Sequence, residues 1–169
     1  MILKQENFCL HNKVRPSLLI LAFTALFAGC SWQEYFVIVN ETNFPVTVQY
    51  NLSETANGFG FFDSEPSAYP FNPTGDIDWS NKLNIKDIDS SKTGISVTLP
   101  SQSTLLIGSL MNEHYESHNQ KDVNDRVNLK NISIIHPEKA FEITAENFEN
   151  YFKKINGNIE FRINSLALQ

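Results

Sequence analysis

The chain has 169 residues, with 19 acidic and 13 basic side chains and a formal net charge of −6 at pH 7. This length suits one domain that buries a sizeable core without disulfides. The acidic balance, with no basic patch along the chain, argues against nucleic acid as a partner.

The first 29 residues have the pattern of a secretory signal. Lys4, Lys13 and Arg15 form a basic start, and residues 18–28, LLILAFTALFA, are then free of charge. A transmembrane helix needs about 20 apolar residues, so this run is too short to cross a bilayer. Its length fits the apolar part of a signal peptide, and we therefore expect it to direct export.

The apolar run ends in residues 26–30, LFAGC, where Ala28 and Gly29 precede Cys30. This stretch resembles the lipobox of bacterial lipoproteins, with Phe27 in the position that most often holds leucine. The resemblance covers only the segment up to Cys30. It implies cleavage before Cys30, acylation of its thiol, and a membrane as partner through that lipid. The expected organisation is a signal peptide (1–29), a lipid anchor with a short tether (30–34) and a single domain (35–169).

The resemblance also places the protein in the cell envelope. In enteric-type diderm bacteria, Asp after the lipidated cysteine favours retention in the inner membrane, and Ser31 occupies that position here. This favours the outer membrane if the host is diderm, with periplasmic and surface exposure both open. Removal of residues 1–29 would take Cys9 with it, so no intramolecular disulfide would remain. It would also leave 140 residues with a net charge of −8, so attachment would depend on acyl chains rather than on attraction to anionic lipids.

Short strands are predicted along the exported part. Residues 35–39, YFVIV, read as a buried strand, and 46–52, VTVQYNL, alternate as a half-buried strand does. The turn-forming residues between them predict a hairpin. Further strands are expected at 95–99, 104–110, 131–135, 141–143 and 158–163. About seven short strands predict a mainly β fold, a β-sandwich with one C-terminal amphipathic helix.

The helix is expected at residues 144–157, TAENFENYFKKING. Its aromatic and aliphatic residues at positions 148, 151, 152 and 155 fall on one helical face. Thr144 suits the N-cap, and Gly157 suits the C-terminal cap.

Residues 53–94 are predicted to form a long irregular excursion, because proline, glycine and short polar residues interrupt every regular pattern there. Its aromatic residues argue against disorder. They suggest a stacking platform for a glycan or a contact surface for a protein partner. The alternative is that the rings fold back and seal the open end of the sandwich. The candidate ligand contacts are Phe59, Phe61, Tyr69 and Trp79.

Two stretches resemble metal sites weakly. His114 and His118 are four residues apart, but no third ligand is evident, and the glutamate of a metalloprotease motif is replaced by Tyr115. Residues 76–87 have part of the spacing of a calcium loop but lack its central glycine. A solvated polar loop and a set of turn-forming acids explain these stretches better, so we expect no metal and no cofactor.

No catalytic residue is assigned, since the chain contains no nucleophile elbow, phosphate-binding loop or dinucleotide fingerprint. The sequence favours a non-enzymatic, membrane-anchored envelope lipoprotein that acts as a binding or structural module. The alternatives are a small envelope hydrolase that uses the His114/His118 region or the acidic loop, and a carbohydrate-binding accessory protein.

Overall fold

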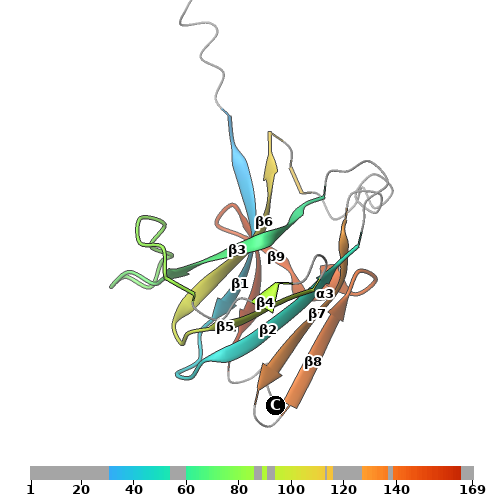
Figure 1. Ribbon diagram of the computed structural model, residues 1–169. Coiled ribbons are helices and arrows are strands. Elements are labelled where there is room, and N and C mark those ends of the chain that lie inside the picture. The colour runs from blue at the N-terminus through green and yellow to red at the C-terminus, as the bar shows by residue number, and fades with distance from the viewer. Residues whose placement is uncertain are drawn as a thin grey trace, which may run out of the picture. The chain divides into compact units, whose positions relative to one another are not determined.

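Two β-sheets face each other across a shared apolar core in the computed structural model (Figure 1). The structure describes residues 31–53, 60–85, 89–90, 94–112, 114–115, 127–136 and 139–164. Within them, each sheet has five strands. Sheet A runs in the order β3 (Phe62–Pro70), β6 (Ser103–Met111), β1 (Gln33–Asn40), β10 (Asn158–Ile163) and β9 (Lys153–Ile155). Sheet B runs in the order β4 (Asp89–Ser90), β5 (Gly94–Leu99), β2 (Val46–Leu52), β7 (Leu129–His136) and β8 (Lys139–Thr144).

The predicted β-sandwich is confirmed, and the strands follow from alternation. In β2, Val46, Val48, Tyr50 and Leu52 are buried while Gln49 and Asn51 between them are exposed. The buried phenol of Tyr50 donates a hydrogen bond to the Asp63 carbonyl oxygen at 2.7 Å, so its hydroxyl group has a hydrogen-bond partner. All seven strands expected from the sequence are present, and β2 and β10 have the expected bounds.

The hairpin expected between the first two strands is not formed. β1 pairs with β10 in parallel and with β6 antiparallel in sheet A, whereas β2 pairs with β5 and β7 in sheet B. The segment between β1 and β2 therefore crosses from one sheet to the other. Asn40 stabilises the crossover, because its buried amide donates to the carbonyls of Phe44 at 2.9 Å and Pro100 at 2.8 Å.

The expected helix is reduced to α3 (Phe148–Tyr151), four residues long, and the segment after it is strand β9. Asn156 and Gly157 have φ of 50° and 86° and form the turn between β9 and β10. Asn-Gly is the dipeptide that tight hairpins favour. Pairing of β9 with β10 therefore overrides the helical spacing, and Gly157 serves a hairpin rather than a helix end.

The excursion expected to be irregular contains a nine-residue strand, β3, and the short strand β4. β3 lies at the edge of sheet A, where a proline costs no ladder hydrogen bond, and it holds Pro66 and Pro70. Its register on β6 shifts between Phe62 and Ser67, so the strand bulges there. The loop after it folds back through bridges between Phe71 and Ile77 and between Ala68 and Leu83.

Gly108 brings β3 close to β6. A Cβ atom at this position would lie 2.0 Å from the carbonyl oxygen of Phe61, closer than any side chain tolerates. That carbonyl accepts a hydrogen bond from the Ser109 amide at 3.0 Å. Glycine is therefore required for the approach of the two backbones.

Among the described residues, no helix has the length and apolar character needed to cross a membrane.

Candidate binding groove on the outer face of sheet A

A groove of about 310 Å³ lies on the face of sheet A that points away from the core. On β10, Ile159, Phe161 and Ile163 are buried in the core, and the residues between them therefore face outward. We call this cavity the outer groove. It is lined by Val39 and Glu41, by Phe71, Gly75, Asp76, Ile77 and Trp79 of the loop after β3, and by Asn156, Asn158, Glu160 and Arg162 of the β9–β10 hairpin.

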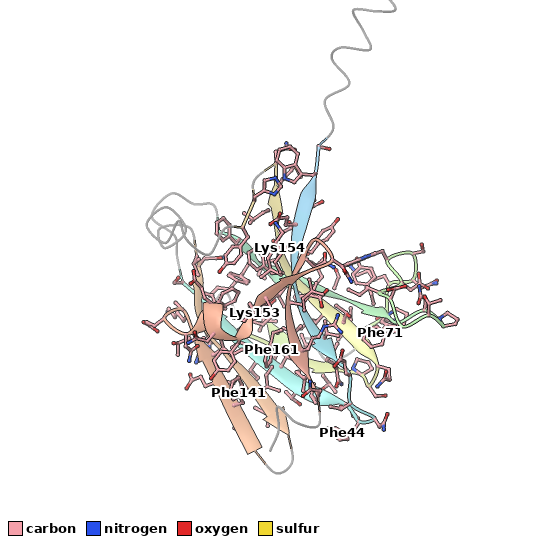
Figure 2. All side chains as sticks on the ribbon, turned by 180° about the vertical axis from the view of Figure 1, so that it is seen from behind. Phe44, Phe71, Phe141, Lys153, Lys154 and Phe161 are labelled. Carbon is pink, nitrogen blue, oxygen red and sulfur yellow. The ribbon has the colours of Figure 1, made fainter. Side chains whose placement is uncertain are left out.

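The loop after β3 covers this face. Val37 and Val39 project from β1 away from the core cluster, yet they are only 0% and 2% exposed. Figure 2 shows Phe71 on the loop, to one side of the hairpin that carries Lys153 and Lys154. The loop shields the valines and leaves the groove between itself and the hairpin.

Asparagine and aspartate side chains stabilise the turns of this loop. The Asn72 side-chain oxygen accepts hydrogen bonds from the Thr74 amide at 3.0 Å and the Asp76 amide at 2.9 Å. The Asp78 carboxylate accepts from the Ser80 amide at 3.1 Å and the Asn81 side chain at 2.6 Å. These are turn-stabilising bonds of asparagine and aspartate. Asp87, the last position of the calcium-like spacing, lies outside the described residues.

Trp79 forms an aromatic wall of the groove. Its ring lies 5.0 Å from the ring of Tyr35 on β1 and 5.0 Å from that of Tyr69 on β3. Two-fifths of its surface stays exposed. The two tyrosines thus support the indole from sheet A, and the rest of the ring is free to contact a ligand.

The other candidate aromatic contacts lie elsewhere. Phe61 is 5% exposed, and its ring stacks on Phe36 at 5.9 Å, so it is a core residue rather than a ligand contact. Phe59 lies outside the described residues. Tyr69 does not line the groove but packs against Trp79. Phe61 is therefore folded back into the core, whereas Trp79 stays partly exposed on the wall of the groove.

Arg162 organises the charges in the groove. Its guanidinium lies 2.7 Å from the Glu160 carboxylate and 2.5 Å from that of Glu41. Partial burial alone would lower the pKa of Arg162, but the hydrogen bonds that its guanidinium donates to the two carboxylates, together with their negative charge, raise it above its ordinary value. With Asp76, the groove holds three carboxylates and one guanidinium. This excess of negative charge disfavours an anionic ligand.

Sequence reasoning missed Glu41, Glu160 and Arg162. The strand NIEFRI did contain a signal, because its polar positions alternate with its apolar ones and must share the outward face. Nothing in the sequence placed that face beside Trp79, which lies more than 70 positions earlier in the chain.

A second polar cluster lies at the start of β1. The Glu34 side chain is 5% exposed, and it accepts hydrogen bonds from the Tyr115 amide at 2.8 Å and the Lys154 ammonium at 2.5 Å. His114 Nδ1 lies 2.8 Å from the same carboxylate. Burial alone would raise the pKa of Glu34, but its hydrogen bonds with His114, Lys154 and Tyr115 hold it below the ordinary value.

Only one histidine of the candidate His114/His118 metal site lies within the described residues. His118 lies outside the described residues, and His114 contacts Glu34. Within the described ranges, no group of three or more His, Cys, Asp or Glu side chains is arranged to hold a metal ion. His114 instead stacks on Trp32, with ring centroids 5.0 Å apart.

Comparisons of this chain with protein-family models, with curated proteins and with solved structures found no significant match. The groove offers an indole face, two asparagine side chains and carboxylates fixed by Arg162. These groups combine an apolar surface with hydrogen-bond donors and acceptors, as small-molecule binding sites do.

Proposed function

We propose that this protein is a non-enzymatic binding module of the bacterial cell envelope, attached to the membrane through lipid on Cys30. In this proposal the outer groove holds an uncharged, hydroxyl-rich ligand of the short-glycan type. The observation that carries the proposal is that Trp79, two-fifths exposed, lines the same groove as the polar residues of β10.

The chemistry of the groove supports a sugar-like ligand. A sugar ring presents a face of C–H groups, which packs on an aromatic ring, and an edge of hydroxyl groups, which hydrogen-bond to carboxylates and amides. Trp79 provides the first surface, and Glu41, Asp76 and Asn158 provide groups of the second kind. The volume of about 310 Å³ lies at the lower end of the range of small-molecule pockets.

The hydrolase alternative has less support among the described residues. Its proposed histidine, His114, is bonded to Glu34, and Asp76 and Asp78 are bonded within their own loop. Glu41 and Glu160 are both paired with Arg162. Each of these acidic side chains already has a structural partner, which favours a binding role.

Acyl labelling and membrane fractionation of the wild type and Cys30→Ser test the anchor. We expect the label and membrane attachment in the wild type only. A Cys30→Ser protein that still carries the label would contradict the lipid assignment.

Retention on immobilised neutral, uronic-acid and phosphorylated oligosaccharides tests the groove. We expect the neutral class to bind and Trp79→Phe to weaken binding about tenfold, equivalent to about 1.4 kcal/mol. Trp32→Phe is the matched control, because it changes the chain's other tryptophan outside the groove. Equal losses in both variants, or preferred binding of the anionic sugars, would refute the groove as the glycan site.

A further inference from the structure

The start of β1 and the end of β6 carry exposed apolar residues on a projecting ribbon. Trp32 is 45% exposed and Met111 is 65% exposed. Met111 is the ladder partner of Gln33, while the Asn112 amide donates to the Trp32 carbonyl at 2.9 Å. Figure 1 shows these two strand ends side by side, extending beyond the rest of sheet A. We call this end, residues 32–34 with 110–112, the ribbon tip.

The two apolar side chains belong to opposite faces of the ribbon. Side chains alternate along a strand, so Met111 lies on the face of its partner Gln33, and Trp32 lies on the face of Glu34. Any surface that the tip enters would therefore contact apolar groups on both sides.

Trp32 is held in its exposed position. Its indole stacks on His114 with ring planes 19° apart. His114 is in turn bonded to the buried Glu34 carboxylate, which also accepts from Lys154 on β9. A chain of contacts through His114, Glu34 and Lys154 thus supports the indole of Trp32 at a position where it is 45% exposed.

The position of Cys30 determines what covers the tip. Only Ser31 separates Cys30 from Trp32, and an extended chain covers at most about 3.6 Å per residue, so the two Cα atoms lie within about 7 Å. The headgroup region of one leaflet is roughly 5–8 Å thick. Acyl chains on Cys30 would therefore hold the tip at the depth of the headgroups.

We propose that the ribbon tip docks into the lipid headgroup region, with Trp32 and Met111 as its apolar contacts. This inference rests on the lipid anchor of the proposed function. Tryptophan favours this region, because its ring is apolar while its N–H still finds a hydrogen-bond partner. Among the described residues, the exposed polar side chains at or beside the tip are Ser31, Gln33, Asn112, His114 and Lys154, none of which is acidic.

Docking would also orient the outer groove. β1 runs away from Cys30, and eight residue steps separate Gln33 from Glu41. At about 3.3 Å per residue, Glu41 lies about 26 Å along the strand from the tip. The Glu41 and Arg162 end of the groove would then face the aqueous phase, where a glycan can reach it.

The test uses the acylated full-length protein in phosphatidylcholine vesicles that contain a lipid brominated near the headgroup. Trp79→Phe leaves Trp32 as the only tryptophan, and Trp32→Phe leaves Trp79 as the matched control. We expect bromolipid to reduce Trp32 emission by about half or more and to leave Trp79 emission unchanged.

Trp32 emission that is unaffected by bromolipid but quenched by aqueous iodide would overturn the docking, and so would equal quenching of both tryptophans. Acyl labelling and vesicle flotation of the same samples separate the two proposals. A protein that floats with unquenched Trp32 refutes the docking alone, whereas a protein without an acyl label refutes the anchor and the docking together.

Discussion

Lys154 Nζ lies 2.5 Å from Glu34 Oε1, although 120 residues separate the two in the chain. The pair joins the first strand of sheet A to the hairpin that closes it. A buried carboxylate is costly unless it is paired and hydrogen-bonded, and Glu34 meets that condition only through residues brought together by folding.

Removal of the lysine partner should destabilise the fold. Lys154→Met keeps the aliphatic stem but leaves Glu34 without its ammonium partner, and we expect a loss of about 1–3 kcal/mol in the free energy of unfolding. Lys153→Met is the matched control, since the exposed Lys153 donates to a backbone carbonyl, that of Glu149, at 2.8 Å. Urea unfolding at neutral pH measures the free energy of unfolding of the two variants. Equal values would show that the Glu34–Lys154 pair does not stabilise the fold.

The stability should depend on pH through Glu34. Its pKa in the folded protein lies below the ordinary value of 4.5, so its contribution is present above that pH and is lost as pH falls through the folded pKa. Burial raises the pKa of Asp63, which acts in the opposite direction. We therefore expect Glu34→Gln to flatten the acid side of the melting-temperature profile, and Glu65→Gln, at an exposed site, to leave it unchanged.

Trp79 should contribute to stability as well as to binding. Trp79→Ala removes ring contacts with Tyr35 and Tyr69, and aromatic pairs are worth about 0.5–1.5 kcal/mol each, so we expect a loss of about 1–3 kcal/mol. Trp79→Phe should recover most of this stability without restoring glycan retention. Thermal unfolding combined with the retention assay separates the two effects, and full recovery of retention by phenylalanine would show that the indole has no specific role.

Because β3 lies so close to β6, substitution of Gly108 should destabilise the protein much more than substitution of Gly157. Gly108→Ala would place a methyl group against the Phe61 carbonyl, and we expect a loss of more than about 2 kcal/mol. Gly157→Ala meets no atom within 4 Å and incurs only the strain of its positive φ, about 1 kcal/mol. Chemical unfolding of both variants compares them directly, and similar losses would contradict the close backbone contact.

Some features of this fold could be predicted because they are local. Alternation of apolar and polar residues identified the strands at 46–52, 95–99, 131–135 and 158–163, since the period of two is set within a few residues. The same reasoning failed at 153–155, where Tyr151, Phe152 and Ile155 fit a helix and Asn156-Gly157 fits a hairpin. Propensity cannot decide between two such patterns, because pairing with β10 supplies the deciding free energy.

The sequence by itself determined the mainly β character and the positions of seven strands, because these depend on short runs of neighbouring residues, and it predicts export and lipidation at Cys30. Only the tertiary structure decided that β1 and β2 lie in different sheets and that Phe61 is buried. It also decided that Trp79 lies beside Glu160 and Arg162 in one groove, and that Glu34 is paired with Lys154. These relationships join residues far apart in the chain, and they are set by how the two sheets bury their apolar faces against each other rather than by any local pattern.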